Sequence, residues 1–113
     1  MLTADRLDES KRSMAAEAFF IVSVSRRRAE WLRATLARGG CDRGFITPHR
    51  HAISYARDSG VSLMIVDAGD PAGRGVHLIR AIRDQGNPVA ILAITRGPNA
   101  SAAVDALDSG ADG

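Results

Sequence analysis

Two aspartates and a run of arginines are the side chains of this sequence best suited to chemistry. Asp67 follows a run of apolar residues, and Asp70 lies three positions further along, in a segment rich in glycine and proline. Carboxylate oxygens are the ligands that a hard cation such as Mg²⁺ prefers, so the two aspartates form a weak candidate metal site. Arg26, Arg27 and Arg28 bring three guanidinium groups together and form a candidate contact for an anion or an acidic partner.

The other reactive side chains form no catalytic or metal-binding pattern. His49 and His51 are two positions apart and point to different sides of a helix, so we expect them and His77 to be surface residues. The single cysteine, Cys41, cannot form an internal disulfide or by itself a zinc site, and we expect it to be a small filler. The sequence also lacks a serine–histidine–aspartate arrangement, a phosphate-binding loop and a dinucleotide-binding glycine fingerprint. We therefore expect neither an enzyme nor a bound cofactor.

Strands and helices alternate along the part of the chain that must position these side chains. Continuous apolar runs predict strands over residues 18–22, 45–46, 61–66 and 88–94. Alternation of such strands with helices predicts an α/β fold, with a parallel sheet covered on both faces and right-handed crossovers. Functional groups in such sheets gather at the carboxyl ends of the strands. Those ends hold Ser23 to Ser25, Thr47, Asp67 to Asp70, and Thr95.

Helical spacing predicts a helix after each of the four strands. Ser25 and Asn99 are expected to cap the first and last helices, and Thr47 with Pro48 is expected to begin the second. Residues at helical spacing are expected to face the core, with an interface as the alternative for Trp31. They are Trp31, Leu32, Thr35 and Leu36 in the first helix, Ala52, Ile53 and Ala56 in the second, Val76, Ile79 and Ile82 in the third, and Ala103, Val104 and Leu107 in the last.

Four features in register resemble those of a known family. The apolar run that ends at Asp67 is followed by Pro71 four residues later and by Gly75 eight residues later. Thr95 ends the next apolar run, and a glycine motif begins at Gly110, fifteen residues further on. Together they resemble the receiver domain, the phosphoacceptor module of two-component response regulators. The resemblance implies a flavodoxin-like fold with strand order 2-1-3-4, Asp67 at the phosphoacceptor position and Thr95 at that of the switch hydroxyl.

This sequence departs from the family pattern at two places. The family holds Mg²⁺ with acidic residues at the end of its first strand, where this chain has Ser23, Val24 and Ser25. Phosphoryl transfer needs a hard cation to neutralise charge at the transferred group, so we expect poor metal affinity. The chain also stops at Gly113, before the family's fifth strand with its lysine. Residues 18–113 are thus expected to form an incomplete receiver-like domain, preceded by a polar tail or short leading helix over 1–17.

Several hypotheses follow for the function. The first is a degenerate receiver domain of a bacterial signalling protein, which contacts a protein partner, an output domain in a longer chain or a second copy. The alternatives are a working receiver that a histidine kinase phosphorylates on Asp67 with Mg²⁺, and a small-anion or nucleotide-binding regulatory domain that uses Arg26, Arg27, Arg28 and Arg96. The arginines at the start of the helix could equally form a solvated basic face, or pair with Asp67 and hold the domain in one state without phosphate.

Composition and charge exclude several other classes of protein. Hydrophobic residues make up 45% and charged residues 25% of the chain, which is typical of a globular domain. A net charge of +2 and 4% aromatic residues give no indication of nucleic-acid binding. No apolar run reaches the ~20 residues that span a membrane, and no secretory signal is visible, so we expect a cytoplasmic protein. We also expect the apolar strand over 88–94 to present an unpaired edge that favours self-association.

Overall fold

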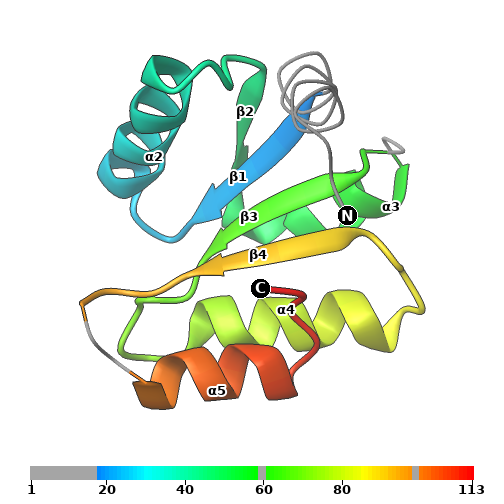
Figure 1. The fold of residues 1–113 in the computed structure, drawn as a ribbon. Coiled ribbons are helices and arrows are strands. Elements are labelled where there is room, and N and C mark those ends of the chain that lie inside the picture. The colour runs from blue at the N-terminus through cyan, green and yellow to red at the C-terminus, as the bar shows by residue number, and fades with distance from the viewer. Residues whose placement is uncertain (1–17, 59–60, 98–99) are drawn as a thin grey trace, which may run out of the picture.

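The computed structural model describes residues 18–58, 61–97 and 100–113. In this part of the chain, strands and helices alternate as the sequence predicts (Figure 1). The strands are β1 (Phe19–Ser23), β2 (Gly44–Pro48), β3 (Leu63–Asp67) and β4 (Ala90–Ile94). The helices are α2 (Arg26–Arg38), α3 (Ala52–Asp58), α4 (Arg74–Asp84) and α5 (Ala100–Asp108), and a short 3-10 helix, η1 (His49–His51), precedes α3.

Within the described residues, the sheet has four strands in the order β2-β1-β3-β4, and every pair is parallel. Ile21 of β1 is aligned with Ile46 of β2 on one side and with Ile65 of β3 on the other. This order confirms the predicted 2-1-3-4 arrangement and the flavodoxin-like α/β fold. Because the strands are parallel, their carboxyl ends meet at one edge, which brings the ends of β1 and β3 together.

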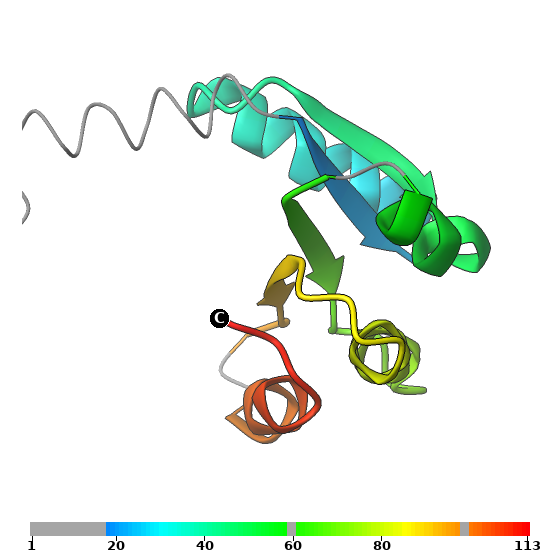
Figure 2. The ribbon, with the colours of Figure 1, turned by 90° about the vertical axis from the view of Figure 1, so that its right-hand side faces the viewer.

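The two faces of the sheet carry separate hydrophobic clusters. Figure 1 shows α2 on one side of the sheet and α4 with α5 on the other, and Figure 2 shows α4 and α5 side by side. The first cluster joins α2 to strand residues, and its buried members are Phe19, Ile21, Ala29, Leu32 and Ile65. The second joins α3, α4 and α5 to the strands, and its largest members are Val22, Met64, Val66, Leu78, Ile79, Ile82 and Ile91. Cys41 packs against the first cluster, which confirms the prediction that it is a filler.

Helix faces are rotated from the predicted ones in two places. In α2, Leu32 is buried as predicted, but Trp31 is 51% exposed, and Thr35 is exposed as well. Since each residue turns the helix by about 100°, a neighbour of a buried position lies on the flank of the helix. In α5, Val104 and Leu107 are about half exposed, and the buried contact comes from Ala106. The prediction that these side chains face the core was therefore wrong, because small alanines let α5 approach its neighbours on a different face.

The start of the second helix also differs from the prediction. Thr47 is not an N-cap but a buried residue of β2, which continues through Pro48. Pro48 tolerates this position because β2 is an edge strand, where a residue without a backbone N–H costs no ladder hydrogen bond. The chain then passes through η1 into α3, where Ala52 and Ala56 are buried as predicted.

The outer edge of β4 is partly covered by the last residues of the chain. Asp112 N donates to Ile91 O at 2.9 Å, and Ala93 N donates to Gly113 O at 2.7 Å. The Asp112 carboxylate also accepts a hydrogen bond from Ile91 N at 2.9 Å. The expectation of an unpaired edge was therefore wrong at Ile91 and Ala93, since the backbone after α5 turns back to pair with the strand.

An arginine of α4 holds this returning segment in place. The Arg83 guanidinium donates to Gly110 O at 2.9 Å, to Val89 O at 2.7 Å and to the Asp112 carboxylate at 3.0 Å. Gly110 has a φ of +119°, and a Cβ there would lie 2.5 Å from Arg83 Cγ, so only glycine fits the turn. We call these contacts the Arg83 clamp.

Two predictions lie outside the described residues. These are the polar tail or leading helix over 1–17 and the N-cap at Asn99.

Candidate functional site

Asp67 is the centre of the candidate site. It is the last residue of β3 and only 4% exposed. One carboxylate oxygen, Oδ2, accepts hydrogen bonds from Ser23 Oγ at 2.8 Å and from Arg28 Nε at 3.2 Å. The other, Oδ1, accepts from Gly69 N at 3.0 Å. Both oxygens of this buried carboxylate are thus engaged by donors of the chain itself.

The surrounding elements dictate this arrangement. β1 lies next to β3 with Val22 aligned with Val66, so Ser23 and Asp67 end neighbouring strands at the same level. Ser23 Oγ also accepts from Ser25 N at 3.1 Å, which fixes the turn into α2. Ser25 is the N-cap of α2, as predicted, and accepts from Arg28 N at 3.2 Å. The cap therefore sets the helical phase that points Arg28 at Asp67.

The ion pair between Arg28 and Asp67 is largely removed from water. The Asp67 side chain is 3% exposed and the Arg28 side chain 23% exposed. The guanidinium carbon of Arg28 also lies 5.3 Å from the centre of the Trp31 ring, within the range of a cation–π contact. Among the interpretations that the sequence left open, pairing of an arginine with Asp67 is thus confirmed for Arg28.

Asp70 is directed to a different arginine. Arg74 Nε donates to Asp70 Oδ2 at 2.8 Å, and Arg74 Nη2 donates to Oδ1 at 3.3 Å. Arg74 N adds a third hydrogen bond, at 3.2 Å to Oδ2. Hydrogen bonds from the Arg74 side chain lower the pKa of Asp70 from 3.8 to about 2. The Asp70 carboxylate is therefore bound by the first residue of α4 through both of its oxygens.

These residues do not fit the Mg²⁺ site that the receiver pattern implies. A hard cation needs several oxygen ligands, and carboxylates supply the charge that holds it. Ser23 gives its proton to Asp67, Val24 has no donor atom, and a guanidinium already neutralises the carboxylate of Asp67. No group of three or more histidine, cysteine, aspartate or glutamate side chains suited to a metal occurs in the described part of the chain.

Two further residues of the receiver-like pattern line the same edge of the sheet. Thr95 directly follows β4 and is half-buried, one position beyond the residue aligned with Asp67. Gly75, in the first turn of α4, lies against the end of β3, and a Cβ there would lie 2.3 Å from the Asp67 carbonyl oxygen. The close packing of α4 on β3 therefore requires glycine at this position.

The structure sets one of the four candidate arginines apart from the other three. Arg26 Nε donates to Glu30 Oε1 at 3.3 Å on the exposed side of α2. Arg27 and Arg96 both line a hollow that Ser25, Arg28 and Trp31 also line. We call this the α2–β4 hollow.

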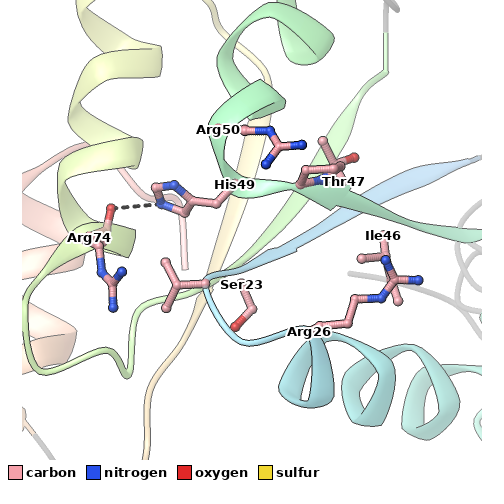
Figure 3. A pocket seen from close by; sticks show the side chains of 9 residues that line it. Ser23, Arg26, Ile46, Thr47, His49, Arg50 and Arg74 are labelled. Carbon is pink, nitrogen blue, oxygen red and sulfur yellow. Dashed lines mark hydrogen bonds between the residues drawn. The ribbon is translucent and has the colours of Figure 1, made fainter.

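A second hollow lies at the ends of β1 and β2, and sequence reasoning missed most of its residues. Figure 3 shows Ser23, Arg26, Thr47, His49, Arg50 and Arg74 around it. His49 Nε2 lies 3.3 Å from the Arg74 carbonyl oxygen, so His49 is a bridge between η1 and α4 rather than a free surface residue. The sequence signal for this role of His49 was its position after a proline at the carboxyl end of β2.

In the described part of the chain, no helix combines the length and the apolar character that crossing a membrane requires.

Comparisons with known proteins identify the fold. No protein-family model and no curated protein matches the sequence. Among solved structures, a LuxR-family two-component response regulator from Aurantimonas sp. SI85-9A1 is similar with a TM-score of 0.65 and 19% identity, over 83% of this chain and 69% of that one. The receiver domain of a putative Luxo repressor protein from Vibrio parahaemolyticus gives 0.66 and 21%, over 85% and 74%.

A third similar structure carries the modification that the receiver pattern implies. It is a response regulator from Burkholderia pseudomallei with a phosphorylated aspartic acid, a calcium ion and citrate, with a TM-score of 0.63 and 24% identity. The match covers 85% of this chain and 56% of that protein. At these identities the likeness shows the fold, which is that of a receiver domain.

Proposed function

We propose that this chain, whose fold is that of response-regulator receiver domains, acts as a degenerate receiver that works through protein contacts without being phosphorylated. The observation that carries the proposal is the hydrogen bonding of Asp67, whose Oδ2 accepts from Ser23 Oγ at 2.8 Å and from Arg28 Nε at 3.2 Å. Two donors of the same chain thus bind one oxygen of the residue at the acceptor position, and Arg28 neutralises its charge.

The chemistry of phosphoryl transfer supports the proposal. A carboxylate that attacks a phosphorus atom must present an unblocked oxygen, and a cation must neutralise the charge on the transferred oxygens. In this chain Ser23 and Arg28 occupy the nucleophile, and Ser23, Val24 and Ser25 supply no carboxylate for a divalent cation. The Arg28 side chain neutralises Asp67 in the way that a bound metal would, but it offers no open coordination position to a phosphoryl group.

The same contacts suit a module that presents one fixed surface. Arg28 joins α2 to β3 at the carboxyl edge of the sheet, so the ion pair ties these two elements together. A partner would then recognise a constant shape, whether it is an output domain in a longer chain, a histidine kinase or a second copy. In this proposal the module needs no Mg²⁺.

Incubation with acetyl phosphate and Mg²⁺, followed by intact mass measurement, tests the proposal. We expect the mass to stay unchanged, because Ser23 and Arg28 already bind the Asp67 carboxylate and the acidic metal ligands are replaced at Ser23, Val24 and Ser25. The matched control is Asp67→Asn, which has no acceptor. An added phosphoryl group that is lost in Asp67→Asn would overturn the proposal and establish a working receiver phosphorylated on Asp67.

A further inference from the structure

We propose that the α2–β4 hollow binds a small phosphate-bearing anion. The hollow lies between the start of α2 and the segment after β4, and it has a volume of about 430 Å³. Small-molecule sites commonly measure about 300–1,000 Å³, so a phosphate group with an attached moiety fits. This inference goes beyond the proposed interaction role, because it gives the domain a ligand of its own.

Uncompensated positive charge is the first argument. Arg28 is neutralised by Asp67, and Arg26 lies opposite Glu30. Arg27 and Arg96 are both exposed, and neither has an ion-pair partner among the residues that the structure describes. None of the residues that line the hollow is acidic, and the first turn of α2 contains no acidic residue. Arg27 and Arg96 therefore line the hollow with no acidic side chain beside them in its wall.

The position of Arg96 is the second argument. The Arg96 stem packs on Gly69, where an added Cβ would lie 2.6 Å from Arg96 Cγ. Gly69 is in turn held by its hydrogen bond to Asp67 Oδ1, at 3.0 Å. The aliphatic part of the Arg96 side chain is thus held in place, because it packs on the backbone of Gly69, which Asp67 fixes by a hydrogen bond. Arg96 lines the hollow together with Arg27 but belongs to the segment after β4, whereas Arg27 belongs to α2.

The third argument concerns the class of ligand. Positive charge in the first turn of a helix is unfavourable, and an anion bound there is stabilised by the helix dipole. Guanidinium groups bind phosphate through paired hydrogen bonds, and the N-terminal N–H groups of a helix add further donors. Trp31, which is 51% exposed, gives the hollow an apolar wall beside these donors. The combination fits a phosphate ester better than a bare halide.

The single tryptophan of the chain makes the proposal directly measurable. Because Trp31 lines the hollow, its fluorescence should change in a saturable way when inorganic phosphate is added at constant ionic strength. A nucleoside monophosphate, compared with the same nucleoside, separates a requirement for phosphate alone from a contribution of an attached ring. Tighter binding of the nucleotide than of phosphate would identify an esterified ligand, and equal binding would identify free phosphate.

Substitutions connect the signal to the two arginines. Arg27→Gln and Arg96→Gln should each weaken phosphate binding about tenfold, since each removes one charged donor. Arg33→Gln is the matched control, because Arg33 is exposed on the same helix but does not line the hollow. Asp67→Asn should tighten binding several-fold, because it leaves the charge of Arg28 free for the ligand. A signal that never saturates, or that survives unchanged in both arginine variants, would overturn the proposal.

Discussion

Two arginine–aspartate pairs lie in different parts of this molecule and do different work. Arg28 pairs with Asp67 at the carboxyl edge of the sheet, and Arg83 pairs with Asp112 beside the last strand. The two arginine side chains are almost equally exposed, at 23% and 22%, but Asp67 is 3% exposed and Asp112 is 58% exposed. The difference between the pairs therefore lies in the aspartate.

The comparison shows which partner each region depends on. At the Asp67 site the charge that must be compensated is on the carboxylate, because it is the buried group. In the Arg83 clamp the guanidinium is the essential partner, because it also donates to the carbonyl oxygens of Asn87, Val89 and Gly110. Removal of the arginine should be costly in both regions. Removal of the Asp112 charge should cost little, and removal of the Asp67 charge should restore stability where Arg28 has been replaced.

The largest effect is expected for Arg28→Met. It leaves the buried Asp67 carboxylate without its counter-ion, so we expect the free energy of unfolding to fall by about 3 kcal/mol. Urea denaturation followed by circular dichroism measures this change. Arg27→Met is the matched control, because the adjacent side chain is exposed, and it should stay within about 0.5 kcal/mol.

The double variant Arg28→Met/Asp67→Asn sharpens this prediction. With the carboxylate removed as well, no buried charge remains unpaired, so most of the lost stability should return. A double variant as unstable as Arg28→Met would mean that packing of the Arg28 stem, and not charge, is what the site requires.

A smaller effect is expected for Arg83→Met. It removes the donors of three backbone carbonyl oxygens that lie near the surface, so we expect a loss of about 2 kcal/mol. Asp112→Asn should cost less than about 1 kcal/mol, because that side chain is exposed and keeps an oxygen acceptor. Amide hydrogen exchange at Ile91 and Ala93 would show whether the segment still covers β4. Protection that persists in Arg83→Met would contradict the role of the clamp.

The smallest effect concerns pH and the pair of Asp70 and Arg74, in which the arginine side chain is 58% exposed. Asp70 has a folded-state pKa of about 2, against 3.8 for the unpaired group. A depressed pKa means that the pair stabilises the fold above pH 3.8 and that this contribution is lost as the pH falls through 2. Asp70→Asn should therefore be less stable than the parent at pH 5, with a difference that shrinks towards pH 2. A constant difference across this range would show that the effect is not ionic.

The strands could be predicted from the sequence, because continuous apolar runs such as the one that ends at Asp67 are typical of strands that are buried on both faces of a sheet. The strand order followed from the resemblance to the receiver family. The helix faces were harder, since Val104 and Leu107 look like core residues on a helical wheel but are half exposed. Which flank of a helix is buried depends on the size of the side chains opposite, and a single sequence does not contain that information.

The candidate site was predicted in its parts but not in its pairing. Three consecutive arginines after Ser25 could each have reached Asp67, and only the helical phase set by the cap selects Arg28. The loss of acidic residues at Ser23 and Val24 was visible in the sequence. The hydrogen bond that Ser23 Oγ donates to Asp67 was not, because it depends on two strand ends that lie 44 residues apart in the chain.

Gly75 shows that a residue of the receiver pattern can be required by the fold and not by phosphoryl transfer. A side chain at this position would collide with the Asp67 carbonyl oxygen, so replacement is barred by the contact between α4 and β3 whether or not Asp67 ever reacts. A glycine at this position therefore indicates how closely α4 packs on β3, but it does not indicate whether Asp67 is phosphorylated. Searches for active members of this fold should therefore give weight to the positions of Ser23, Val24 and Arg28, because the residues there decide whether carboxylates or hydrogen-bond donors surround Asp67.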